Sequence, residues 1–308
     1  MEGEDRGSRW LARRPAVSAA AGALVIAFSA PLVKLAEVSP STAAVFRCAY
    51  ALPPLALLAF AERRRYGAAQ TGDRRLALLA GLFFAADLTF WHHSIEAVGA
   101  GLATVLANVQ VILVGLLEWA VLRERPSRRS ALAVPVVLLG VVLISGAVGA
   151  GAYGEDPTLG VLYGLLTALA YALFLLVLRR AGRDSRRPAG PLFDATLAAA
   201  AFAVVGGVAV GDFDPIPAPE AQAWLVTLAL TSQVVGWLLI SVSLPRIPAL
   251  VTSIVLTIQP VGSVVLGVAM FDEAPSAFQL AGVALILSGV VVATARARPR
   301  RRLALDSP

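Results

Sequence analysis

Long apolar runs recur along the chain, and each is close to the length of one membrane-spanning helix. A helix rises about 1.5 Å per residue, so about 20 residues cross a bilayer core of about 30 Å. The runs do not alternate between polar and apolar residues, as the strands of a membrane barrel do. The pattern predicts an all-α membrane protein with ten transmembrane helices: Ala16–Val33, Thr42–Ala61, Leu76–Ile95, Gly101–Leu122, Ala131–Val148, Leu159–Leu178, Leu192–Val210, Ala223–Ser243, Ala249–Phe271 and Ala277–Ala295.

The composition excludes an ordinary soluble domain. The 308 residues are 58% hydrophobic and 15% charged, with a mean hydropathy of +0.76, whereas a soluble domain is about a quarter charged. The single cysteine, Cys48, rules out a disulfide within the chain and is interpreted as a small packing residue. The isoelectric point of about 10.2 would suit nucleic acid, but the placement of the charges argues against that partner.

The basic residues alternate between the two sides of the predicted membrane. With the N-terminus in the cytoplasm, 24 of the 26 Lys and Arg residues fall in cytoplasmic loops and tails, and Lys34 and Arg47 fall outside. This distribution follows the positive-inside rule and places both termini in the cytoplasm, with the arginines facing anionic lipid. Arg47, about one turn into its helix, is expected to snorkel to the interface or, alternatively, to attract an anionic solute. Arginine exceeds lysine and alanine is abundant, which suggests a GC-rich genome and hence a bacterial inner membrane.

The second half of the chain repeats the first half weakly. Residues 91–145 and 240–294 align at an offset of 149 with 13 identical positions of 55. The identical polar and proline residues are the informative matches between the two halves: Ser94/Ser243, Gln110/Gln259, Glu124/Glu273, Pro126/Pro275 and Ser127/Ser276. The offset contains five spans, an odd number, so the second copy enters the bilayer upside down. Two inverted five-helix repeats of this kind are a transporter architecture, with the solute site near the membrane midplane between the halves.

The repeat and the loops divide the chain into four parts. We expect a cytoplasmic tail at 1–15, a first repeat at 16–148, a second repeat at 159–295 and a second cytoplasmic tail at 296–308. The longest connecting loops are rich in Gly, Pro and charge, as loops are, and a short glycine-rich turn at 99–101 is expected between the third and fourth spans.

Two motif pairs resemble a known family. They are VLANVQVILVGLLEWAVLRERPS with VLLGVVLISG in the first half, and IVLTIQPVGSVVLGVAMFDEAPS with ALILSGVVVAT in the second. The chain is similar over nearly its whole length to the drug/metabolite transporter superfamily, specifically to proteins with two EamA domains. This resemblance implies the ten-helix fold and transport of small solutes, and it favours export of amino acids or related metabolites. Val111 stands where many relatives have a proline, which puts a kink in this helix in doubt.

Asp87 is the first candidate for a solute or ion site. It lies near the middle of the predicted span Leu76–Ile95, where a carboxylate costs at least about 2.5 kcal/mol on insertion scales. At 100° per residue, Trp91 and Ser94 share its helix face. Asp87 could bind a cation, a proton or a substrate amine, or it could simply tie two helices together by hydrogen bonds.

The other candidates are uncharged. Asn108 lies in the middle of its helix, Gln110 lies on a different face of the same helix, and Gln259 is its counterpart in the second repeat. Pro260 follows Gln259 and removes a backbone N–H, which is tolerated where the helix lines a cavity. Gln233 and Trp237 are four residues apart near the middle of their span and could face the same space. Such residues also serve plain helix packing, so both interpretations stand.

Several polar residues are interpreted as structural. His92 and His93 lie near the outer interface without a spaced set of ligands, so no metal and no cofactor is expected. Glu124 and Glu273 precede Pro-Ser and are expected to accept N–H bonds at the start of the following helix.

Three functions compete at this point. The first is a secondary active transporter, expected to work in the export direction, that moves small metabolites by alternating access. The chain has one lysine outside any phosphate-binding loop, so transport must use an ion gradient, such as a proton gradient, or solute exchange. The second is a flippase of lipid-linked carriers. The third, an intramembrane enzyme, needs a nucleophile and base at one depth, and Asp87 has no evident partner. The expected partners are a solute, membrane lipid and a coupling ion, with a homodimer left open.

Overall fold

The computed structural model describes residues 15–122, 128–144, 148–149, 151–184, 186–243, 256 and 258–294. Within this part of the chain every regular element is a helix. The elements in order are α2 (Pro15–Ala27), α3 (Ser29–Ala36), α4 (Pro40–Tyr66), α5 (Thr71–Ala107), α6 (Gln110–Leu122), α7 (Arg128–Ile144), α8 (Pro157–Ala181), α9 (Ala189–Val210), α10 (Pro219–Leu228), the π-helix η1 (Ala229–Gly236), α11 (Trp237–Ser243), α13 (Ile258–Phe271) and α14 (Ala277–Thr294).

Six of the described helices are long and apolar enough to cross a membrane by length and composition. They are Pro15–Ala36, Pro40–Tyr66, Thr71–Val114, Pro157–Ala181, Ala189–Val210 and Pro219–Ser243. Three shorter apolar helices accompany them at Leu132–Ile144, Ile258–Phe271 and Ala277–Gly289. The all-helical membrane fold is therefore confirmed, and the count of ten spans stays a prediction.

Thr71–Val114 contains two of the predicted spans, which a kink separates at Gly99. Gly99 has φ 83° and ψ 168°, a backbone conformation that side chains with a Cβ rarely adopt. The glycine-rich turn expected at 99–101 is thus present at its first residue.

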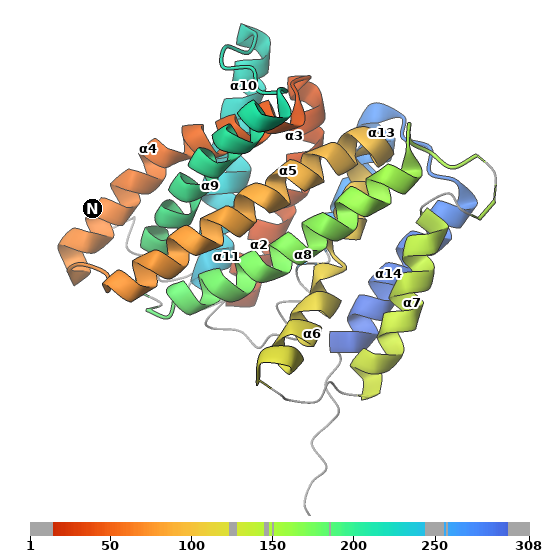
Figure 1. Cartoon of the computed structure of the whole chain (residues 1–308), viewed down its shortest axis with the longest axis horizontal. Coiled ribbons are helices and arrows are strands. Elements are labelled where there is room, and N and C mark those ends of the chain that lie inside the picture. The colour runs from red at the N-terminus through yellow and green to blue at the C-terminus, as the bar shows by residue number, and fades with distance from the viewer. Residues whose placement is uncertain are drawn as a thin grey trace, which may run out of the picture.

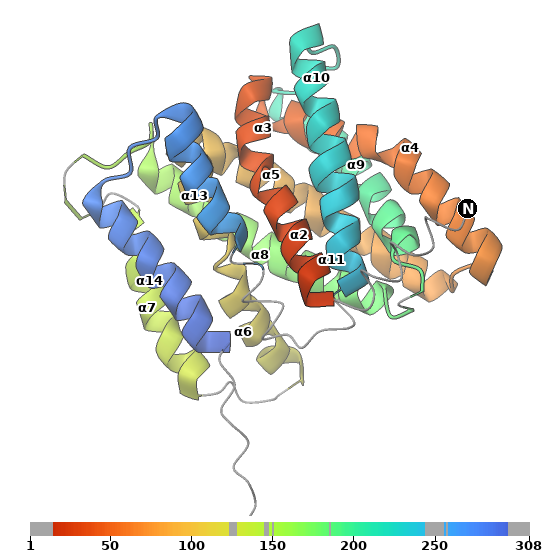
Figure 2. The ribbon, with the colours of Figure 1, turned by 180° about the vertical axis from the view of Figure 1, so that it is seen from behind.

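The helices pack in pairs that join distant parts of the chain. α5 packs against α8 and α9, α4 against α9, and α7 against α14. Figures 1 and 2 both show α7 beside α14 at one end of the molecule and α2 beside α11 nearer the middle. Gly22 of α2 and Gly236 of η1 permit close contact, because a Cβ on Gly22 would lie 2.9 Å from the carbonyl oxygen of Gly236.

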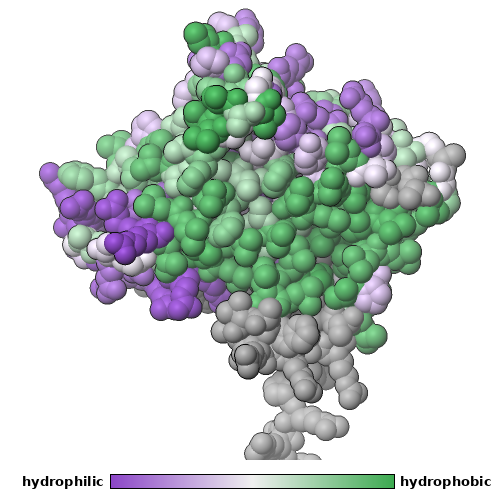
Figure 3. All heavy atoms as spheres, viewed as in Figure 1, coloured by the Kyte–Doolittle hydropathy of each residue, from purple (hydrophilic) through white to green (hydrophobic). Residues whose placement is uncertain are grey.

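The surface separates into polar ends and an apolar belt. Figure 3 shows a broad hydrophobic zone across the face, with hydrophilic side chains gathered at its opposite edges. Leu57, Phe60, Val205 and Val208 are examples of exposed apolar residues in the helices. An exposed apolar belt of this extent suits contact with lipid, because a soluble monomer rarely leaves so large a patch uncovered.

Candidate functional site

A small cavity of about 50 Å³ lies among α2, α3, α4, α5, α8, α11 and α13. Five of the seven residues predicted to form a solute or ion site line it: Asp87, Trp91, Asn108, Trp237 and Gln259. Gln233 does not line this central cavity but contacts a residue that does, as described below. Gln110 is buried at the start of α6 and lies outside the cavity lining.

Two opposite charges share the central cavity. Asp87 of α5 is 7% exposed and Arg47 of α4 is 3% exposed, and both line it. Both belong to the described residues, where no direct ion pair joins them, so each charged group is open to a partner within the cavity. A buried charge is costly unless it is paired, so the site suits a ligand with two opposite charges.

Arg47 is held inside the protein, and its expected snorkelling to the interface is wrong. Its Nε donates a hydrogen bond to Oε1 of Gln233 at 3.1 Å, and Nε2 of Gln233 donates to Oγ1 of Thr196 at 3.1 Å. The guanidinium carbon lies 5.8 Å from the centre of the Trp91 ring. This chain of contacts aligns the arginine and fixes Gln233, which explains why Gln233 is fully buried without lining the cavity.

An aromatic cluster forms one wall of the central cavity. Phe84 stacks on Phe174 with ring centres 4.4 Å apart, and the Trp237 ring meets both edge-on at 5.7 and 5.1 Å. Tyr171 adds a further edge contact to Trp237 at 6.1 Å. Three of these four rings come from helices outside α5.

Four buried polar atoms around the cavity lack a hydrogen-bond partner. They are Oγ of Ser29, Oγ1 of Thr167, Nε1 of Trp237 and Nε2 of Gln259. Buried polar groups are nearly always paired in folded proteins. Four such groups lie around one cavity, beside two charges, so this cavity is the candidate site of the described part of the chain.

Two helix irregularities shape the site. α5 ends at Ala107 and α6 begins at Gln110, so the helix breaks at Asn108 although Val111 replaces the expected proline. Nδ2 of Asn108 donates to the carbonyl oxygen of Thr104 at 2.9 Å, an alternative use of a backbone acceptor that favours such breaks. The doubt about a kink here is resolved in favour of one.

The second irregularity is the π-helix η1, which the sequence pattern did not predict. It contains Gln233 and leads directly into Trp237. π-Helical turns are rare and occur often at functional sites. Gln233 contacts Arg47, while Trp237 joins the aromatic wall of the cavity.

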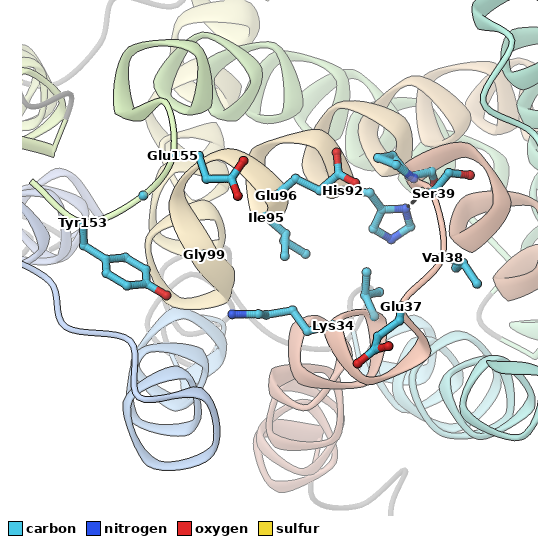
Figure 4. Close-up of a pocket in the computed structure, with 13 residues that line it drawn as sticks. Lys34, Glu37, Val38, Ser39, His92, Ile95, Glu96, Gly99, Tyr153 and Glu155 are labelled. Carbon is cyan, nitrogen blue, oxygen red and sulfur yellow. Dashed lines mark hydrogen bonds between the residues drawn. The ribbon is translucent and has the colours of Figure 1, made fainter. Parts of the chain in front are cut away.

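A larger cavity of about 690 Å³ lies beyond the central one and is referred to below as the vestibule. Figure 4 shows Lys34, Glu37, His92, Glu96, Tyr153 and Glu155 around its open centre. Lys34 donates to Oε1 of Glu273 at 2.9 Å, and the 3% exposed Glu273 also accepts from the backbone N–H groups of Ala100 (2.8 Å) and Gly101 (3.2 Å).

The structural role expected of Glu273 is present, but its partners differ from the prediction. The carboxylate caps the helix start after Gly99, in the other half of the chain, and these bonds replace the expected ones to the following helix α14. Glu124 lies outside the described residues. Among the described residues, no group of three or more histidine, cysteine and acidic side chains could hold a metal ion.

Comparisons with known proteins agree with this geometry. No curated protein matches the chain. A solved crystal structure, titled only as that of a protein, is 19% identical with a TM-score of 0.63, and the match covers 91% of this chain and 98% of that one. This likeness supports the fold alone. The model of the EamA-like transporter family matches residues 14–146 and 158–295, one repeat after the other. The chain therefore belongs to the EamA-like transporter family and is a multi-pass membrane transporter of small molecules.

Proposed function

We propose that the protein is a secondary transporter of zwitterionic amino acids or closely related metabolites, working in the export direction by alternating access. The proposal rests on the presence of Asp87 and Arg47 in the same buried cavity, where no direct ion pair between these described residues is formed. An amino acid presents an ammonium and a carboxylate a short distance apart. Asp87 would receive the ammonium, and Arg47 would receive the carboxylate through its fork of N–H donors.

The unpartnered polar atoms complete such a site. Nε1 of Trp237 and Nε2 of Gln259 can only donate, which suits a carboxylate beside Arg47. The hydroxyls of Ser29 and Thr167 can donate or accept, so either end of the solute could use them. The aromatic wall of Phe84, together with the rings packed around it, would receive an apolar side chain.

Binding requires the cavity walls to move. A volume of about 50 Å³ is less than the share of two water molecules at about 30 Å³ each, so an amino acid needs a more open conformation. The cavity has walls from the proposed first repeat, 16–148, and from the proposed second repeat, 159–295. A rocking movement between inverted repeats would widen it toward one side of the membrane at a time.

Energy coupling follows from the same carboxylate. With a substrate amine and a proton competing for Asp87, release of one would accompany binding of the other, which is the basis of solute–proton exchange. Outward flux in proteoliposomes with and without a pH gradient would test both the coupling ion and the direction.

The decisive test compares Asp87→Asn with a matched variant, Asp194→Asn. Asp194 has nearly the same burial, 6% exposed, but it does not line the central cavity and binds Arg74 near one end of α5 and α9. Cells of a sensitised bacterial host would be challenged with toxic amino acids and analogues at equal expression levels. We expect wild type and Asp194→Asn to protect against one chemical class, and Asp87→Asn to lose protection.

Analogues of the protected substrate test the two charges separately. The amide lacks the carboxylate, and the deaminated acid lacks the ammonium, so each leaves one buried charge unpaired. Both should compete for transport at least about tenfold more weakly than the parent amino acid. Equal competition by either analogue, or full protection by Asp87→Asn, would refute the zwitterion site, and flux of a lipid-linked carrier would replace it with the flippase function.

A further inference from the structure

We propose that the vestibule is a second binding site, selective for small organic cations that carry a protonated amine. The vestibule is separate from the central cavity, and the proposed amino acid site does not use it. Its volume of about 690 Å³ lies within the range of about 300–1,000 Å³ typical of small-molecule sites.

His92 supplies the deepest contact of this site. It is 1% exposed and lines the vestibule. Its Nδ1 lies 3.0 Å from the carbonyl oxygen of Pro40, which can only accept, so Nδ1 carries the hydrogen. In the neutral imidazole Nε2 is then an acceptor.

Nε2 of His92 is buried and has no hydrogen-bond partner in the protein. Figure 4 shows the His92 ring at the edge of the vestibule; protein atoms cover Nε2, so a ligand in the vestibule would reach it through a small displacement of the lining side chains. An acceptor left without a donor costs free energy when it is buried. A ligand N–H group in the vestibule would satisfy it.

The charges around the opening favour a cation. Glu37, Glu96 and Glu155 line the vestibule and are exposed, and Lys34 is its one positive group among the described lining residues. The charge of Lys34 is already balanced by Glu273 at 2.9 Å. Three carboxylates therefore remain, with a weak contact of 3.7 Å from Glu96 to Nδ1 of His93.

The acidic character extends beyond the vestibule. Asp212 and Asp214 lie in the loop after α9, which contacts Ser41 and Thr42 at the same end of the molecule. A cleft lined by charges of one sign raises the local concentration of ions of the opposite sign. The described residues offer no group able to bind a bare metal ion, so an organic ammonium, with N–H donors for His92, is the chemistry that fits.

Binding of n-butylammonium to the full chain in lipid nanodiscs tests the proposal, with n-butanol and butyrate as neutral and anionic probes. An Asp87→Asn background excludes binding in the central cavity. Trp91 lies 5.3 Å from the His92 ring, so tryptophan fluorescence provides a nearby signal. We expect n-butylammonium to bind and the other two probes to bind at least about tenfold more weakly.

Variants identify the binding groups. His92→Leu should weaken n-butylammonium binding about tenfold, because one buried acceptor is lost. The double variant Glu37→Gln/Glu155→Gln changes only exposed positions, so it should fold normally, bind more weakly at low salt and lose most of the salt dependence. Glu220→Gln, at an exposed acidic residue outside the vestibule lining, is the matched control and should bind as its parent does.

Two results would overturn the proposal: butanol or butyrate binding as tightly as n-butylammonium, or the double glutamine variant binding with the affinity and salt dependence of its parent. Neither result depends on transport. Failure of the amino acid site would appear as normal protection by Asp87→Asn, while the vestibule measurements would stand unchanged.

Discussion

Replacing Glu273 by glutamine should destabilise the protein strongly, because one buried carboxylate joins three donors. It accepts from the N–H groups of Ala100 and Gly101 and from Lys34, and its side chain is 1% exposed. Glutamine has the same shape but no charge, and it offers a single acceptor oxygen. Its amide N–H groups would lie next to some of these three donors, which would then lose the carboxylate oxygen that accepts their hydrogen bonds.

The magnitude follows from what is left unpaired. Breaking one partner of a buried ion pair costs about 3–5 kcal/mol. Lys34 is 27% exposed, so water stabilises part of its uncompensated charge and the lower end, about 3 kcal/mol, applies. One kcal/mol shifts Tm by about 2–4 °C in chains longer than about 150 residues, so we expect Tm to fall by about 6–12 °C.

Thermal unfolding of purified protein, followed by tryptophan fluorescence in one detergent, measures this change. Lys34→Met keeps both backbone bonds of Glu273 and should lower Tm less, by about 2–4 °C for a loss near 1 kcal/mol. The double variant should cost less than the sum of the two, since both remove the same ion pair. Unfolding of Glu273→Gln at the wild-type temperature would refute the reasoning.

Three further predictions concern packing, a surface ion pair and the aromatic wall. Gly207→Ala would place its Cβ 2.8 Å from a side chain of α4, so it should lower Tm through a loss of about 1–3 kcal/mol in the free energy of unfolding. Gly206→Ala meets nothing within 4 Å, so it should keep or raise Tm through a gain of up to about 1 kcal/mol. Equal Tm values for the two variants would contradict this. Arg74→Gln breaks the pair with Asp194, but Arg74 is 55% exposed, so the loss should stay below about 1 kcal/mol in urea or thermal unfolding; a larger loss would show that the pair is shielded from water. Trp237→Phe keeps an aromatic ring in the wall but removes the unpartnered Nε1–H and part of the indole, so it should reduce transport and lower Tm modestly; flux measured below the Tm of the variant tests the donor, and unchanged flux would remove it from the site.

Asp87 was predictable because its chemistry alone made it unusual. A carboxylate in the middle of an apolar span needs a reason whatever the packing around it, so the sequence pattern is enough. Trp91 and Gln259 followed from helix periodicity and from the repeat. The kink at Gly99 was visible as a glycine-rich turn between two apolar runs.

Arg47 could not be predicted in the same way. Its position about one turn into a helix is also where a snorkelling arginine lies, and sequence distance to Gln233 is 186 residues. Only tertiary packing brings the amide to Nε. The break at Asn108 was missed for a related reason, because the sequence rule looked for a proline while a side-chain bond to Thr104 breaks the helix instead.

Two of the side-chain links between the proposed repeats bear directly on a conformational change. Arg47–Gln233 joins α4 to η1 beside the central cavity, and Lys34–Glu273 joins α3 to the end of α13 beside the vestibule. If the halves separate toward the vestibule, the pair near the vestibule must break, while the deeper pair can persist as a pivot. Variants that weaken Lys34–Glu273 should therefore favour the conformation open toward the vestibule. In a chain with cysteine at the buried position of Thr104, a bulky thiol reagent applied from the vestibule side should react faster with the Lys34→Met variant than with its parent. Equal labelling rates would mean that this pair stabilises the fold without holding the vestibule side closed.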